Sequence, residues 1–376
     1  MACFATVTLS LMLSYLLIDI ASTFQVSLGK ASQTSLFSSI TVVITALILT
    51  FLSLRFKQKS LIIIGLICML SSGIGCFFAP TLNLLYLSYS LQGVASVMVF
   101  PMALALVGNT YPTQKRAKAV SYLVAAASFS NLVVVCLTGL IATNFGWRFI
   151  PLLFAVPASS VALVLVFLFV PSYSENSLAV TSTDYLKKIK SILSNRSATA
   201  CFIGNSLRTS AHMAISLFGV SFYRQRFLIT MGQSTVLMLG GTLLFIVGTL
   251  ISGNISSRFG KKPLTIFSSA LAGLFIICLY YMPNFWFALP FDYLALFFFG
   301  LASSAALSHT LDQVPTSRST LMSLNTVFGA LGTAIAPTLG GTILDAFSFE
   351  AMGLTLGALG AIAAIVFVFT KEQNSK

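Results

Sequence analysis

The stretch "GNISSRFGKKP", Gly253 to Pro263, gathers three cations in a short glycine-containing turn between two long apolar runs. Clustered cations are unexpected here, because only 8% of the 376 residues are charged and 57% are hydrophobic. A soluble globular domain carries about 25% charged residues. The chain has too few polar side chains to cover a surface that faces water, so we expect most of it to face lipid.

Apolar runs of about 20 residues recur along the whole chain, and a helix of this length crosses the hydrocarbon core of a bilayer. No alternating strands of the kind that form membrane β-barrels are visible. The first run is interpreted as a retained helix and not as a signal peptide, because no Lys or Arg precedes Lys30. We predict an all-α membrane protein with twelve transmembrane helices, at residues 3–25, 34–54, 61–79, 84–108, 118–142, 149–170, 198–221, 233–255, 263–282, 287–310, 320–343 and 349–370.

The net charge of +13 is distributed unevenly between the two sides of the predicted spans. Arg208 falls within a span, and one side holds only Lys30, Arg148, Arg224 and Arg226. The opposite side holds sixteen cations: Arg55, Lys57, Lys59, Lys115, Arg116, Lys118, Lys187, Lys188, Lys190, Arg196, Arg258, Lys261, Lys262, Arg318, Lys371 and Lys376. This asymmetry follows the positive-inside rule and places both termini and the Gly253 turn in the cytoplasm. We interpret the basicity as a topology signal and expect no nucleic-acid binding.

The reactive side chains favour neither a metal site nor an enzyme. All six cysteines lie in apolar spans without C-x-x-C spacing, which is typical of packing residues. The two histidines lie in distant spans, and no nucleotide-binding P-loop of the form G-x-x-x-x-G-K-[ST] occurs. We therefore predict no metal, no cofactor and no direct use of ATP.

The longest polar stretch, residues 171–197, divides the predicted spans six and six. We predict an N-terminal six-helix bundle at 1–170, a cytoplasmic linker at 171–197 and a C-terminal six-helix bundle at 198–376. Within the linker, "DYLKKIKSIL" places apolar residues on one helical face and lysines opposite; the apolar residues are Leu186, Ile189, Ile192 and Leu193. This pattern predicts a short helix on the cytoplasmic membrane surface.

The two halves overlay when the chain is shifted by about 203 residues. The basic turn therefore occurs once in each half, and two pseudo-symmetric bundles built on one plan are predicted. The aligned landmarks are "TFLSLRFKQKS" (Thr50 to Ser60) on the Gly253 stretch, Gly29 on Gly232, Pro112 on Pro315, and "TGLIATNFGWRF" from Thr138 on "GGTILDAFSFEA" from Gly340.

The repeated turns resemble the major facilitator superfamily of secondary transporters, and most closely its twelve-helix exporters of drugs and metabolites. The family's signature turn reads G-x-L-a-D-r-x-G-r-k, and the stretch from Gly253 matches it except at Ser257, where Asp is usual. The copy from Thr50 keeps Arg55 but has lost both glycines and the Asp. "YSLQGVAS" resembles a fourth-helix motif with Tyr89 in place of Arg, and the fifth helix lacks the proline that exporters usually have.

The resemblance implies a cytoplasmic gate. In the family's arrangement Asp312, at the end of the tenth span, lies near Arg258, and we predict an ion pair between them that holds the outward-open state. His309 either tunes Asp312 or caps its helix. Alternatively, these residues only anchor the topology at the lipid headgroups. The predicted gate residues are Arg55, Gly253, Arg258, Gly260, Lys261, His309 and Asp312, with the glycines allowing close backbone approach.

The seventh span carries Asn205, Arg208 and His212, and their spacing places them on one helical face. A charge in the hydrocarbon costs about 2.5–3.5 kcal/mol on insertion scales. We therefore predict that this face lines the central cavity; the alternative is an internal anchor hydrogen-bonded to other helices. Asp19 is either a proton-coupling carboxylate or a counter-charge near the outer rim.

Family resemblance adds Gln92 and Asn131 to the predicted cavity. It also draws attention to "GALGTAIAPTLGG" in the eleventh span, which is similar to the family's G-P-x-x-G-G motif. Pro337, Gly340 and Gly341 predict a bend at this point, because small residues and a proline let helices pack closely and still move.

These patterns predict a secondary active transporter that moves a small organic molecule by alternating access, with proton-coupled export as the main interpretation. Coupling is assigned to Asp19 or to the Arg208–His212 face, whose positive charge fits an anionic or neutral substrate at least as well as a cationic drug. The open alternatives are a facilitator or uptake carrier and a degenerate sensor that does not transport. We expect a monomer in the plasma membrane whose partners are its substrate, protons and lipid.

Overall fold

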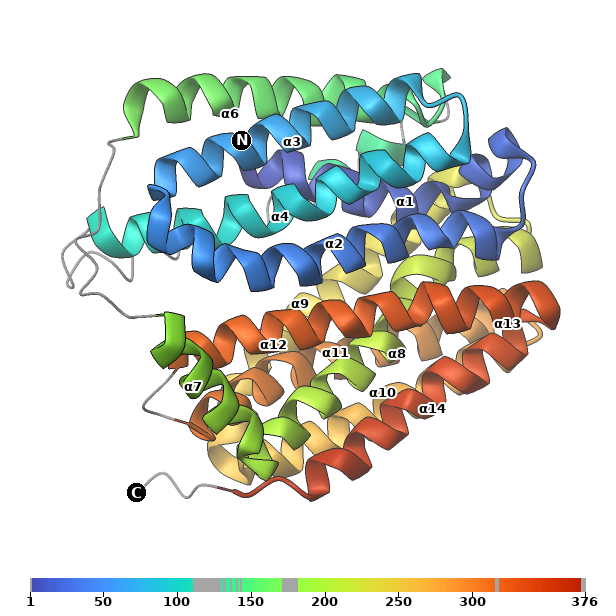
Figure 1. Cartoon of the computed structure of the whole chain (residues 1–376). Coiled ribbons are helices and arrows are strands. Elements are labelled where there is room, and N and C mark those ends of the chain that lie inside the picture. The colour runs from blue at the N-terminus through green and yellow to red at the C-terminus, as the bar shows by residue number, and fades with distance from the viewer. Residues whose placement is uncertain are drawn as a thin grey trace. The chain divides into compact units, whose positions relative to one another are not determined.

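The computed structural model describes residues 2–110, 144–170, 182–314 and 318–372, together with residue 130 and the segments 133–135, 137–139 and 141–142. Within these residues the regular secondary structure is entirely helical (Figure 1). The chain divides into two compact units: unit 1 comprises residues 1–27 and 31–179, and unit 2 comprises residues 28–30 and 180–376.

Unit 1 is built from long helices that follow one another through short turns. α3 packs against α4 and α6, and α1 packs against α4. Its described elements are α1 (Ala2–Phe24), α2 (Leu28–Arg55), α3 (Gln58–Phe78), α4 (Leu82–Thr110), and the π-helical η1 (Pro151–Ala155), which continues into α6 (Val156–Phe169).

Unit 2 has the same kind of construction. α10 packs against both α11 and α14, α9 packs against α11, and α8 packs against α12 and α14. Its elements are α7 (Ser182–Ser194), α8 (Arg196–Arg226), α9 (Met231–Phe259), α10 (Lys261–Tyr281), α11 (Phe285–Asp312), α12 (Arg318–Ile335), the π-helical η3 (Ala336–Gly340), α13 (Gly341–Ala346) and α14 (Phe349–Val368).

Local sequence signals set the helix ends. Thr230 and Gln233 form a capping box at the start of α9, with each side chain hydrogen-bonded to the other residue's backbone N–H. Asn284 and Ser348 cap α11 and α14 through their side-chain oxygens. Gly260 separates α9 from α10 with φ +89°, a backbone conformation that favours glycine.

Most predicted spans coincide with apolar helices that the structure describes, but α8, which carries the predicted seventh span, is not among the helices apolar enough to cross a membrane. Nine helices in the described part of the chain are long and apolar enough to cross a membrane, and Thr8–Phe24 adds a shorter apolar helix. The helix ends differ from the ends of the predicted spans by a few residues in either direction. Most of the predicted fifth span, 118–142, lies outside the described residues, so the total of twelve stays a prediction.

The internal repeat is visible in where the helices begin. α2 begins at Leu28 and α9 at Met231, α3 begins at Gln58 and α10 at Lys261, and each second helix starts 203 residues after the first. The shift found in the sequence therefore carries over to helix boundaries, since the residues that end one helix and start the next recur at the same offset.

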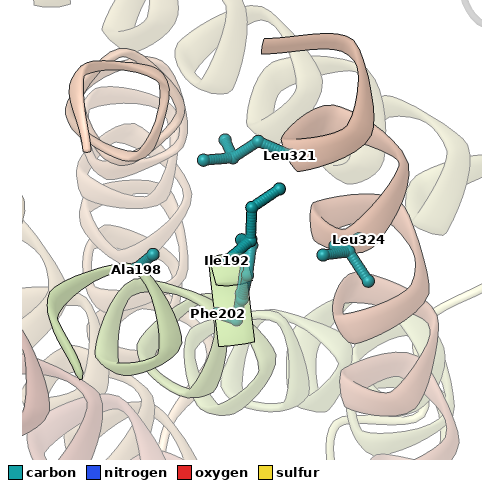
Figure 2. Packing of buried hydrophobic residues seen from close by; sticks show 5 residues of the cluster. All are labelled: Ile192, Ala198, Phe202, Leu321 and Leu324. Atoms are coloured by element: carbon teal, nitrogen blue, oxygen red, sulfur yellow. The ribbon is translucent and has the colours of Figure 1, made fainter. Parts of the chain in front are cut away.

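The linker contains the predicted amphipathic helix, α7, and its apolar face contacts protein. Ile192 is buried with Ala198 and Phe202 of α8 and Leu321 and Leu324 of α12 (Figure 2). Ile189 also packs against this cluster, whereas Leu193 is 40% exposed. Burial of Ile192 against α8 and α12 holds this helix to unit 2. Its location on the membrane surface stays a prediction.

Candidate functional site

The polar residues of the seventh predicted span lie on α8 and have different surroundings. Asn205 is 4% exposed. Its amide donates one hydrogen bond to Thr310 Oγ1 of α11 at 3.1 Å and another to Asn325 Oδ1 of α12 at 2.9 Å. Asn205 therefore joins three helices, which is the anchoring role that the sequence left open as the alternative for this residue.

Arg208 lies one helical turn further along α8, near the middle of the helix. Its Nε is buried and has no hydrogen-bond partner within the described part of the chain. No acid of that part forms an ion pair with it. A buried guanidinium nitrogen with an unused donor is costly, because it has lost hydration without gaining a partner. Arg208 is thus a candidate donor for a ligand that accepts hydrogen bonds.

His212 follows Arg208 by one more turn and is surrounded mainly by aromatic rings. Its ring centroid lies 5.5 Å from that of Phe245 on α9 and 5.0 Å from that of Phe299 on α11. Ser216 Oγ lies 3.3 Å from its Nε2. The imidazole therefore packs between α9 and α11. Of these two residues, it is Arg208 that has a buried nitrogen without a hydrogen-bond partner in the described chain.

In unit 1, Gln92 has a structural role that the sequence did not reveal. Its side chain is 3% exposed. Ser38 of α2 donates to Gln92 Oε1 at 2.6 Å, and Gln92 Nε2 donates to Ser10 Oγ of α1 at 2.8 Å. The amide thus links α4 to α1 and α2 through both of its polar atoms. A role for Gln92 in substrate binding stays a prediction.

Two other predicted cavity residues remain as predictions. Asp19 is partly buried on α1, and its backbone carbonyl accepts hydrogen bonds from Ser22 at 2.9 Å and Thr23 at 2.7 Å. Asn131 lies outside the described residues. The described residues contain no group of three or more His, Cys, Asp or Glu side chains that could hold a metal ion.

The predicted ion pair between Arg258 and Asp312 is wrong, because Asp312 pairs with a different cation. Lys261 Nζ, and not Arg258, lies 2.5 Å from Asp312 Oδ2. Arg258 belongs to the last turn of α9 and is exposed, whereas the chain turns at Gly260 and brings the first residue of α10 to the end of α11. The physical reason is the positive φ of Gly260, which sets the direction of the following residue.

One further gate prediction needs correction, and another concerns a side chain that lies outside the described residues. A Cβ at Gly253 would meet no atom within 4 Å, so close backbone approach does not explain this glycine. The roles predicted for His309 stay predictions: its side chain is 2% exposed, its Nε2 lies 2.8 Å from Thr370 Oγ1, and it interacts electrostatically with Asp312. The side chain of Arg55 is not among those described.

Around His309 lies a polar cluster that sequence analysis missed. Gln313 Nε2 donates to Lys371 O at 3.0 Å, and Ser197 Oγ accepts from Lys371 N at 2.7 Å. Lys262 Nζ donates to Thr370 O at 2.6 Å. These bonds fasten the segment after α14 to α8, α10 and α11. No sequence signal identifies them, because their partners are far apart along the chain.

The bend predicted in the eleventh span stays a prediction, and the structure has a π-helical segment at this position. Pro337 lies inside η3, a π-helical segment between α12 and α13. π-helical turns are rare and occur often at functional positions of longer helices. Pro337 removes a backbone donor, which explains why the regular α-helix is interrupted at this point.

Sequence analysis also missed Asp292, which lies on α11 among apolar residues and is 1% exposed. An acid within "FALPFDYLALFFF" is the signal that could have identified it, since ionisable residues inside a membrane span are rare and usually functional.

Comparisons with known proteins agree with this architecture. The family model described as Major Facilitator Superfamily matches residues 1–317 and 216–376. The chain is similar to "Multidrug resistance protein 2" of Bacillus subtilis (strain 168), with 24% identity over 329 residues that cover 77% of this chain and 74% of the relative. It is also similar to "Uncharacterized MFS-type transporter YwfA" of the same organism, with 23% identity over 409 residues that cover 100% and 92% of the two chains.

Solved structures show the same fold. The D-xylose-proton symporter has a TM-score of 0.80 at 15% identity, covering 100% of this chain and 98% of its own. The nucleoside transporter NupG has a TM-score of 0.76 at 15% identity, covering 98% of each chain.

Proposed function

The chain belongs to the major facilitator superfamily of membrane transporters, and from this premise we propose that it moves a small organic molecule across the plasma membrane by proton-coupled export. It is a multi-pass membrane protein and a transporter rather than an enzyme. In the proposed mechanism the two bundles open a central site to each side of the membrane in turn. The similarity to a multidrug resistance protein favours export.

The observation that carries the proposal is Arg208. Its buried Nε without a partner lies near the middle of α8, in a helix whose neighbours supply no acid to it among the described residues. A substrate that brings a carboxylate, phosphate or other strong acceptor would satisfy the guanidinium, because charged hydrogen bonds contribute about 1.5–3 kcal/mol each. The proposed substrate class is therefore a small organic anion, or a neutral molecule rich in acceptors.

Two experiments in sequence test this function. A thermal-shift screen of organic anions on the purified protein finds ligands, because a molecule that binds the folded state stabilises it by mass action. Flux of each ligand is then measured in proteoliposomes with and without a pH gradient. We expect accumulation that depends on the gradient. Ligands that bind but never cross would favour the sensor, and flux that ignores the gradient would favour a facilitator.

A gate built on the Lys261–Asp312 ion pair forms part of the proposal, with both termini in the cytoplasm. The pair joins the start of α10 to the end of α11. The two side chains are 37% and 28% exposed, and pairs of this kind contribute about 0.2–1 kcal/mol to stability. Such a pair is weak enough to break during a transport cycle.

Charge reversal tests the gate. Lys261→Asp and Asp312→Lys each replace an attraction by a repulsion, so we expect flux to fall about three- to tenfold in either variant. The double variant carries the pair in the opposite order and is expected to recover at least half of the wild-type flux. Thermal unfolding of all three is measured alongside. Equal flux in the single and double variants would show that these residues only anchor the helices at the headgroups.

A further inference from the structure

Unit 2 contains a buried acid outside the polar residues of α8. Asp292 lies on α11, seven residues after Phe285, and its side chain is 1% exposed. Neither carboxylate oxygen has a hydrogen-bond partner within the described residues. An ionised carboxylate in this position would have lost its hydration without compensation, which is among the most costly arrangements in a protein interior. Burial therefore favours the neutral carboxylic acid.

The groups around Asp292 are phenols. Tyr223 of α8 is fully buried, its hydroxyl also has no hydrogen-bond partner in the described chain, and it interacts electrostatically with Asp292. Tyr280 of α10 and Tyr293 of α11 also interact with the carboxyl group. The hydroxyl of Tyr280 is already engaged, since it donates to Ala214 O at 2.7 Å.

Among the described residues, no cation forms an ion pair with this acid. α9 approaches it through Gly240 and Gly241, which lie against Tyr293. The basic residues of α10 and α11 lie at the opposite ends of those helices, at Lys261, Lys262 and His309. The last turn of α8 carries Arg224 and Arg226, of which Arg226 is paired with Glu350. Within the described residues, neither the Asp292 carboxyl group nor the Tyr223 hydroxyl has a hydrogen-bond partner, so each is available to the other and to a proton.

We propose that Asp292, assisted by Tyr223, is a proton-binding site inside unit 2, and that it carries the proton whose movement drives the proposed transport. This inference rests on the proposed function. In the step itself, a hydronium ion gives its proton to one carboxylate oxygen and leaves as water, and the reverse step regenerates the carboxylate. While the carboxylate is charged, the hydroxyl of Tyr223 donates a hydrogen bond to it, which offsets part of the cost of ionisation.

A proton fits this site better than a metal ion does. Hard cations take several oxygen ligands, about six to eight for Ca²⁺ and six for Mg²⁺. Asp292 and Tyr223 offer three oxygens, and no second acid lies in the cluster among the described residues. A proton needs only one oxygen and a neighbour that responds to the charge.

The location couples the proton to the rest of the unit through two helices. α8 carries both Tyr223 and Arg208, and α11 carries both Asp292 and Phe299, which packs on His212. Fifteen residues separate Tyr223 from Arg208, or about 22 Å along a helix. The proton site thus does not touch a ligand at Arg208. Ionisation would act through the packing of α8 on α11, because the charged acid requires water or a shifted hydroxyl.

The test uses Asp292→Asn, which has nearly the same shape and is permanently neutral like the protonated acid. In proteoliposomes with a ligand from the thermal-shift screen, we expect gradient-driven accumulation to fall at least tenfold. Exchange of labelled for unlabelled ligand without a gradient is expected to stay within about twofold of wild type, because exchange requires no net proton movement. Glu350→Gln removes a carboxylate whose partner is Arg226 at 3.1 Å and serves as the matched control. Retained gradient-driven accumulation in Asp292→Asn would overturn the proposal.

A spectroscopic readout separates this proposal from the proposed function. The infrared carbonyl stretch of a protonated carboxyl group is recorded on the purified full chain near neutral pH. We expect this band in wild type and in Glu350→Gln, a decrease in Asp292→Asn, and a shift in Tyr223→Phe, which keeps the ring and loses the hydroxyl. An unchanged band in Asp292→Asn would overturn the proton site whatever the transport assay shows. If the band decreases but wild type ignores the pH gradient, the site stands as a proton site and the proposed coupled function fails.

Discussion

In Arg208→Gln we expect ligand affinity and transport flux to fall about 30- to 1,000-fold. Removing one partner of a buried charged contact typically costs about 2–4 kcal/mol or more. Glutamine retains hydrogen-bonding atoms but removes the positive charge, and the Nε that is buried without a partner is removed with it. Ligand affinity is measured by thermal shift or calorimetry, and flux is measured in proteoliposomes. Both readouts should fall together.

Two further variants make the Arg208 result specific. Arg208→Lys keeps the charge but loses the planar, two-pronged donor geometry, so we expect intermediate affinity. Arg196→Gln removes an exposed guanidinium from the first turn of the same helix and should leave binding unchanged. If Arg208→Gln bound and transported as wild type does while unfolding at a lower temperature, Arg208 would be an internal anchor, which is the alternative that the sequence left open.

The second large effect is expected at Gly300, where α9 and α11 touch through their backbones. A Cβ at Gly300 would overlap the carbonyl oxygen of Phe245 and lie 3.0 Å from Thr249 N, both of which are backbone atoms. On the other side of the contact, a Cβ at Gly248 would overlap the carbonyl oxygen of Phe297. Close approach at small residues is how membrane helices gain packing without a hydrophobic driving force.

Gly300→Ala is therefore expected to destabilise the protein by about 1–3 kcal/mol, the usual cost of overpacking, and Gly300→Val by more. The thermal unfolding midpoint of purified protein in detergent reports the change. Gly329→Ala is the matched control, because a Cβ at Gly329 would meet no atom within 4 Å. That variant should be neutral or slightly stabilising, since alanine is the better helix former by about 1 kcal/mol. Equal midpoints for the two alanine variants would contradict the close contact.

Much of the architecture was predictable because its determinants are local. A run of apolar residues needs only its own length to cross a bilayer, so the spans of α3, α10 and α14 could be read from their residues alone. The repeat was equally local, because the turns that precede α3 and α10 recur at one offset. Pro337 marked the position of the π-helical segment η3 without reference to any neighbour.

The candidate site was predictable only in part. The residue types and spacing on α8 identified Arg208 as a charge that needs an explanation inside the membrane. They could not distinguish Asn205, which binds two neighbouring helices, from Arg208, whose Nε binds none in the described chain. Asp292 carried the same signal as Arg208, yet its importance follows from burial and from Tyr223, which lies 69 residues earlier in the chain.

The sequence by itself determined that the chain is helical, that it crosses a membrane repeatedly and that its two halves share one plan. The tertiary structure alone decided which groups meet: Lys261 with Asp312, Gln92 with Ser10 and Ser38, and Tyr223 with Asp292. The physical reason is the distance along the chain over which each property is determined. Helix formation and membrane crossing depend on residues within a few turns, whereas the partner of a polar side chain depends on the rotation and depth of helices that come from distant parts of the chain.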